Sequence, residues 1–76
     1  MKELMAFIAG RLVEHPDRIE VNLQEEGDTV TVELRVAQED LGKVIGKQGR
    51  TARAMRAVLA ASMAGDGKRA RLEIVE

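Results

Sequence analysis

The chain has 76 residues, enough for one hydrophobic core and too few for two, and it carries a formal net charge of −1. Apolar residues make up 45% of it and charged residues 33%, which excludes a disordered chain. It contains no cysteine for a disulfide or thiolate site, and no apolar run approaches the ~18–20 residues of a membrane helix. These features predict one cytoplasmic domain over residues 1–76 with no membrane association.

The charges are distributed unevenly along the chain. Residues 1–38 hold four basic and eight acidic residues, whereas residues 39–76 hold eight basic and five acidic residues. Residues 41–57 contain no acid, and their basic residues are Lys43, Lys47, Arg50, Arg53 and Arg56. On charge alone, this segment is equally a solvated helix face or a surface that binds anions.

The first predicted element is a helix over residues 2–14, because apolar residues recur there at helical spacing. Its expected apolar stripe is Leu4, Met5, Ile8 and Leu12. Pro16 stops it, since the residue before a proline is pushed out of the helical region.

The period then changes to two, which predicts a hairpin. Residues 19–24 and 29–36 alternate apolar with polar side chains on either side of a turn that contains Gly27. The expected inward residues are Ile19, Val21, Leu23, Val30, Val32, Leu34 and Val36.

Two helices and a strand follow. Glu39 and Asp40 can cap a short helix over residues 40–45, and glycines then separate it from a longer helix over residues 50–63. The longer helix is expected to share one face among Ala52, Met55, Val58, Leu59 and Ser62. A last strand over residues 69–75 turns Ala70, Leu72 and Ile74 inward.

The element order is therefore α-β-β-α-α-β. The last strand returns after a helical crossover, so it should lie parallel to the second strand, with a right-handed connection. We expect an α+β fold in which three helices cover one face of a three-stranded mixed sheet and leave the other face in water.

The most informative segment is Gly46-Lys47-Gln48-Gly49, at the junction of the two later helices. Glycines lack the β-carbon that would hold a phosphodiester backbone away from the main chain. The first turn of the following helix presents free N–H groups and the positive end of a dipole, which favour an anion. Lys47, Arg50 and, one turn further, Arg53 add positive charge around the same point.

Val44-Ile45-Gly46-Lys47-Gln48-Gly49-Arg50-Thr51, between two helices after a hairpin, resembles the Gly-X-X-Gly loop of KH domains. That loop clamps four backbone nucleotides of a single strand. The element order is similar to the type II KH arrangement, and nearly the whole chain resembles the short bacterial KhpA family. The resemblance implies a single-stranded RNA-binding protein, acting as an RNA chaperone or post-transcriptional regulator. The expected RNA-binding residues are Lys43, Ile45, Gly46, Lys47, Gln48, Gly49, Arg50 and Arg53.

The resemblance also implies a shallow groove for the bases. One wall would be residues 44–46 and the other the loop and strand of residues 65–74, but whether Val44 or Ile45 lines the groove stays open. The position three residues after the second glycine, often isoleucine in the wider family, is Ala52 in this chain. Phe7 is the one aromatic residue, so stacking on aromatic platforms is not expected.

Other functions find less support in the sequence. The spacing from Gly42 to Lys47 does not match a P-loop, and His15 has no paired ligand or nucleophile, so neither an enzyme nor a cofactor is expected. A protein-interaction module is the alternative, since the KhpA family is associated with a larger KH-containing partner, KhpB or Jag. Binding of single-stranded DNA is a third possibility.

A charge-free face of the long helix could form the interface of a homodimer, or of a heterodimer with a KhpB- or Jag-like partner. The alternative is that the alanines are there because alanine is the best helix former. The face comprises Ala54, Ala57, Ala60, Ala61 and Ala64.

Overall fold

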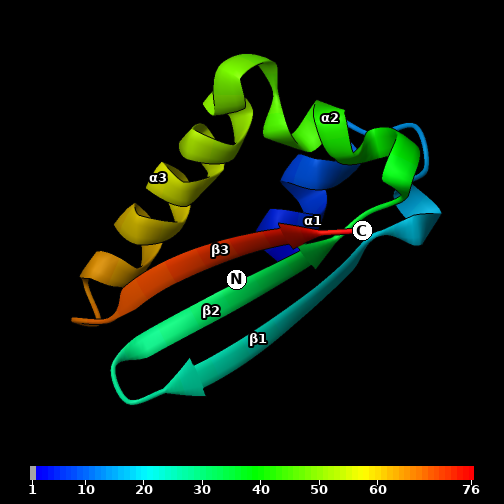
Figure 1. Cartoon of the computed structure of the whole chain (residues 1–76). Helices are drawn as coiled ribbons and strands as arrows, with labels where there is room; N and C mark the ends of the chain where they lie inside the picture. Colours follow the sequence, from blue (N-terminus) through cyan, green and yellow to red (C-terminus); the bar gives the residue numbers. More distant parts are fainter. Residues whose placement is uncertain (1) are drawn as a thin grey trace.

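The computed structural model describes residues 2–76 and has the predicted order of helices and strands (Figure 1). The elements are α1 (Lys2–Gly10), β1 (Glu20–Glu26), β2 (Thr29–Arg35), α2 (Leu41–Ile45), α3 (Arg50–Ala64) and β3 (Arg69–Val75). Short 3-10 turns lie at Pro16–Arg18, Gln38–Asp40 and Lys47–Gly49. In this described part of the chain, no helix has both the length and the apolar character needed to cross a bilayer.

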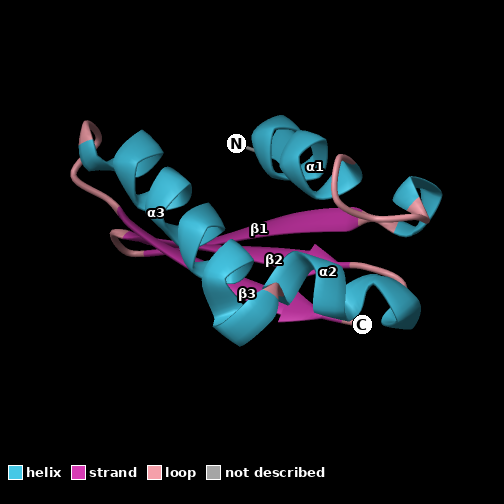
Figure 2. Cartoon of the chain, turned by 90° about the horizontal axis from the view of Figure 1, so that it is seen from above, coloured by secondary structure: helices cyan, strands magenta, loops and turns pink. Residues whose placement is uncertain are grey.

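The sheet has the order β1-β2-β3, with β1 antiparallel to β2 and β3 parallel to β2. Val21 pairs with Leu34 in the first register, and Val32 pairs with Leu72 in the second. All three helices lie on one face of this sheet (Figure 2). The predicted α+β architecture with a three-stranded mixed sheet is thus confirmed.

The core lies between the sheet and the helices. The alternation on β2 is confirmed, since Val30, Val32 and Leu34 are buried, as is Val36 just beyond the strand. The helices contribute the buried side chains Met5, Ala9, Val44, Ala52, Met55, Leu59 and Met63. Ala52 is accordingly a buried residue of the first turn of α3.

The prediction for the first helix is wrong in its length and partly wrong in its buried face. α1 ends at Gly10, and the N–H of Arg11 is shared between the carbonyls of Phe7 and Ile8. Glycine is a poor helix former, which favours an end at this point. Met5 is buried as predicted and Ile8 is half-buried, but Ala9 is the second buried position, and Leu4 and Leu12 are exposed.

The expected face of α3 is also partly wrong. Ala52, Met55 and Leu59 are buried as predicted, but Val58 is 40% exposed and Ser62 is exposed. Met63 completes the buried stripe instead, because steps of three and four residues from Ala52 lead to it.

β1 buries fewer residues than its alternation predicts. Val21 is buried, but Leu23 is exposed, because β1 is an edge strand and pairs only with β2. Ile19 precedes the strand and is half-buried.

Candidate nucleic-acid interface

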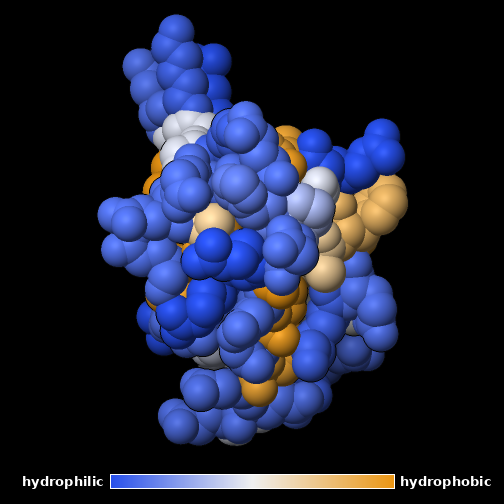
Figure 3. Space-filling view, turned by 90° about the vertical axis from the view of Figure 1, so that its right-hand side faces the viewer, coloured by the Kyte–Doolittle hydropathy of each residue, from blue (hydrophilic) through white to orange (hydrophobic). Residues whose placement is uncertain are grey.

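The junction between α2 and α3 is a tight reversal of the chain. The N–H of Gly46 donates to the carbonyl of Gly42 at 2.9 Å and ends α2, and the N–H of Gly49 donates to the carbonyl of Gly46 at 3.1 Å. α3 begins at the next residue, Arg50. This junction lies at the top of Figure 1, and the top of the same molecule in Figure 3 is a projecting lobe of hydrophilic side chains. The segment that the sequence singled out therefore protrudes into solvent.

Gly46 is required by both its backbone angles and its surroundings. Its φ is 77°, a region that side-chain-bearing residues rarely adopt. A β-carbon at this position would also lie 2.7 Å from Cβ of Thr51 and 2.9 Å from the Thr51 nitrogen. The main chain at Gly46 therefore lies directly against the first turn of α3. Gly49 has φ 74°, but a β-carbon there would meet open space.

Gln48, between the two glycines, also has a left-handed backbone, with φ 57° and ψ 26°. The guanidinium Nη2 of Arg53 donates a hydrogen bond to the Gln48 carbonyl at 2.9 Å. This bond ties the middle of the loop to α3 one turn further along. Arg53 thus contributes to the conformation of the loop as well as to its charge.

The cations nearest the loop are accessible. Lys47 and Arg50 are exposed, and within the described residues neither forms an ion pair with a carboxylate. The leading N–H groups of α3 have no acceptor inside the helix, so the positive end of its dipole lies at the same place. Backbone donors, a helix terminus and two uncompensated cations together make a site suited to phosphate.

The structure shows which of Val44 and Ile45 belongs to the core. Val44 is fully buried in the core, whereas Ile45 is 37% exposed. Of these two residues, Ile45 is therefore the one with an accessible side chain. On the opposite wall that the resemblance implies, Ala70 and Ile74 of β3 are half-buried.

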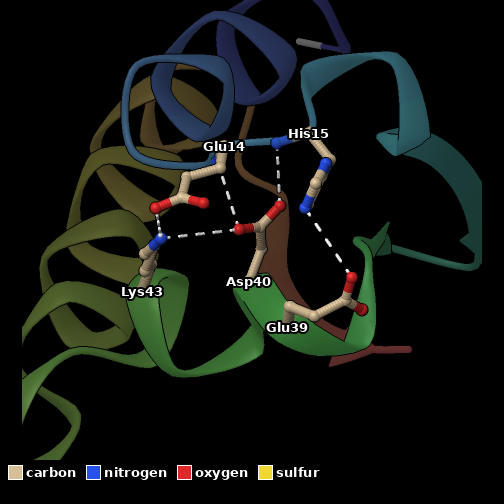
Figure 4. A network of polar contacts seen from close by, with 5 residues as sticks. All are labelled: Glu14, His15, Glu39, Asp40 and Lys43. Atoms are coloured by element: carbon tan, nitrogen blue, oxygen red, sulfur yellow. Dashed lines mark hydrogen bonds and ion pairs between the residues drawn. The ribbon is translucent and has the colours of Figure 1, made fainter.

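Lys43 is placed differently from the other predicted site residues. Its ammonium lies 2.7 Å from Oε1 of Glu14 and 3.8 Å from Oδ1 of Asp40 (Figure 4). The hydrogen bond from Lys43 lowers the pKa of Glu14, and the same bond raises the pKa of Lys43. Lys43 is thus already paired with carboxylates, unlike Lys47 and Arg50.

Asp40 is fully buried, and sequence reasoning assigned it the wrong role. It makes no side-chain cap for α2. Instead, its Oδ1 accepts the N–H of Glu14 at 3.1 Å, and its Oδ2 accepts the N–H of His15 at 3.0 Å. Burial alone would raise the pKa of Asp40, but these N–H groups and the charge of Lys43 hold that pKa below its ordinary value. Its partners lie 25 and 26 residues away, and no local pattern in a single sequence marks such a pair.

Comparison with known proteins gives consistent matches over the whole fold. The model of the family "KhpA/KhpB, KH domain" matches residues 2–74. The chain is 46% identical to RNA-binding protein KhpA of Halalkalibacterium halodurans, over the full length of both. It is 47% identical to the protein of the same name from Caldanaerobacter subterraneus, over 99% of this chain and 100% of the relative. It is also 47% identical to that of Aquifex aeolicus, over 100% of this chain and 96% of the relative. With its α-β-β-α-α-β order and its glycine loop between α2 and α3, the chain belongs to the KhpA/KhpB family of KH domains.

Proposed function

We propose that the chain is a single KH unit that binds single-stranded RNA and holds the phosphate backbone at Gly46–Gly49. The observation that carries this proposal is the glycine loop at the start of α3, with the exposed cations Lys47 and Arg50, which have no carboxylate partner in the part of the chain that the structure describes. The name of its relatives, RNA-binding protein KhpA, points in the same direction.

Each loop residue has a distinct role in this proposal. Gly49, where a β-carbon would meet open space, lets a strand approach the main chain, whereas Gly46 lets the loop pack against Thr51. Lys47 and Arg50 bind phosphate oxygens as the backbone passes. Gln48 is exposed between the two glycines, and Arg53 fixes the Gln48 carbonyl and adds charge. Lys43 contributes less directly, because its ammonium is already paired with Glu14.

The bases would lie against Ile45 and the β3 side, where recognition rests on apolar contact and main-chain hydrogen bonds. Phe7, the one aromatic residue, lies on α1 and is 65% exposed, with the Arg11 guanidinium 5.8 Å from its ring centre. The loop region therefore offers no stacking platform, and a single domain should bind with modest affinity. Modest, sequence-tolerant binding suits an RNA chaperone or a post-transcriptional regulator.

The test is the double substitution Lys47→Asp with Gln48→Asp, which places two carboxylates where phosphates would lie. Both positions are exposed, and aspartate tolerates the left-handed backbone of Gln48, so stability should change by less than about 1 kcal/mol. RNA affinity should fall at least about tenfold, or about 1.4 kcal/mol, in a titration with labelled single-stranded RNA.

The matched control is Arg18→Asp with Gln24→Glu, which changes the net charge equally at exposed positions outside α2 and α3. It should bind RNA nearly as the parent does. A DNA oligomer of the same sequence, titrated in parallel, separates RNA binding from general single-strand binding. A folded loop variant that retained the parent affinity would exclude Gly46–Gly49 as the contact.

A second candidate function is assembly through α3, either with a second copy of the chain or with a KhpB-like protein. The exposed alanines Ala54, Ala57, Ala60, Ala61 and Ala64 favour it, because small side chains permit close approach of another helix. Ala57→Glu should reduce the assembled mass in light scattering, whereas Ser62→Glu, also exposed on α3, should not. A parent chain that is monomeric at high concentration would rule out self-association.

A further inference from the structure

A buried carboxylate joins two segments that are distant in sequence. Asp40 precedes α2, and its two oxygens accept the N–H groups of Glu14 and His15 in the segment that follows α1 (Figure 4). Lys43, one turn into α2, completes the arrangement by pairing with both Glu14 and Asp40. We refer to Glu14, His15, Asp40 and Lys43 as the Asp40 clamp. His15 adds an outer contact, with Nε2 3.7 Å from Oε2 of Glu39.

The clamp fixes one end of the helix that carries the loop. α2 has 5 residues, far fewer than the ~12–15 at which an isolated helix becomes even marginally stable, so its direction must be set by tertiary contacts. Val44 anchors its middle, and Asp40 anchors its start. From Asp40 to Gly46 the chain advances about 9 Å at 1.5 Å per residue, so a tilt at the clamp moves the loop.

The choice of bonding partners supports a positioning role. An aspartate before a helix ordinarily accepts N–H groups of that helix, which would stabilise α2 locally. Asp40 forms no such cap and directs both oxygens to another segment. A buried carboxylate with two main-chain donors has one well-defined geometry, since a shift of either segment leaves a buried polar group unpaired.

We propose that Asp40 is a positioning residue for nucleic-acid binding, which holds α2 so that the loop from Gly46 to Gly49 keeps the shape that receives phosphate. This inference rests on the proposed function. Asp40 then contributes to RNA affinity without touching the RNA. Lys43 belongs to the same positioning unit and not to the phosphate contacts.

The principal test compares Asp40→Asn with Val21→Ala. Asparagine keeps the volume of aspartate, but its NH2 group meets one of the two main-chain N–H groups, donor against donor. Val21→Ala truncates a buried side chain of β1 and lowers stability at a position outside the Asp40 clamp and the loop. Both variants are titrated with labelled single-stranded RNA well below their melting transitions, where both are folded.

Asp40→Asn should weaken binding at least about fivefold, as expected when the loop holds its binding shape only about a fifth of the time. Val21→Ala should bind as the parent does. Without RNA, amide hydrogen exchange of residues 46–50 should accelerate in Asp40→Asn and not in Val21→Ala. Equal affinity and equal loop exchange in the two variants would overturn the proposal.

Lys43→Met provides a second measurement, which stands even if Asp40→Asn does not fold. A positioning role predicts weaker RNA binding with an unchanged dependence on salt, because no phosphate contact is lost. A direct contact predicts a log–log salt slope smaller by about 0.7, and that result would refute the inclusion of Lys43 in the unit. Failure of the proposed function is distinguishable, since the parent and the Lys47→Asp, Gln48→Asp variant would then show the same affinity.

Discussion

At the scale of single residues, Gly46 and Gly49 share a motif but are constrained differently. Both have positive φ, yet only Gly46 lies against another part of the chain, at Thr51. Gly46→Ala should therefore be the more destabilising change, by at least about 2 kcal/mol, since steric overlap adds to the cost of the left-handed backbone. Gly49→Ala should cost about 1 kcal/mol, from the backbone alone.

Chemical denaturation of the two alanine variants and the parent measures this difference. If Gly49→Ala proved as destabilising as Gly46→Ala, the contact with Thr51 would not be the cause.

The same residues show what a sequence reveals about a site and what it does not. The glycine spacing and the surrounding cations identify the loop, because backbone freedom and charge are properties of individual residues. The choice between Val44 and Ile45 could not be made, since a helix of 5 residues has too few turns for its buried face to stand out. The position of Asp40 before α2 predicts a helix cap, because a carboxylate that caps its own helix and one that binds a distant segment look the same in a sequence.

At the scale of elements, the strands were predicted more accurately than the faces of the helices. A period of two assigns each side chain to one of two opposite faces, so the inward residues of β2 and β3 follow directly. On α1 and α3 the apolar residues are more numerous than the buried positions. A rotation by one residue then exchanges Ile8 for Ala9 or Ser62 for Met63 as a buried position without violating helical spacing.

The contact between α2 and the segment after α1 should depend on pH. The pKa values of Asp40 and Glu14 are held below their ordinary values of 3.8 and 4.5 in the folded chain. Their contribution to stability is therefore present above those ordinary values and is lost as the pH falls through the lower, folded-state values. Lys43 has a raised pKa, so its contribution is complete below 10.5 and is lost only as the pH rises beyond it.

We expect the melting temperature of the parent to fall as the pH is lowered from about 6 to about 3, and Asp40→Asn to show a shallower fall over that interval. Thermal unfolding followed by circular dichroism at several pH values measures both. Parallel curves for the two proteins would mean that other carboxylates cause the acid sensitivity.

At the scale of the whole molecule, the net charge of −1 conceals a separation of charge along the chain. Ion pairs neutralise part of the basic half, since Lys43 pairs with Glu14 and Lys68 with Glu25 at 3.3 Å. Lys47, Arg50, Arg53 and Arg56 form no ion pair within the described residues. A chain of nearly zero net charge can thus still attract a polyanion at one place, and the local surplus decides the interaction because salt screens charges beyond about 10 Å.

This local surplus sets the salt dependence of RNA binding. If Lys47, Arg50 and Arg53 each neutralise one phosphate, the logarithm of the association constant should fall against the logarithm of the salt concentration with a slope of about −2, at roughly 0.7 per contact on a single strand. Arg50→Ala should reduce the magnitude of the slope by about 0.7, because it removes one counterion-releasing contact. Arg18→Ala, an exposed cation after α1, should leave the slope unchanged. Titrations at four or more salt concentrations measure all three slopes. A flat response of the parent would be incompatible with phosphate binding at the loop, and a reduced slope for Arg18→Ala would place the RNA on a surface other than the start of α3.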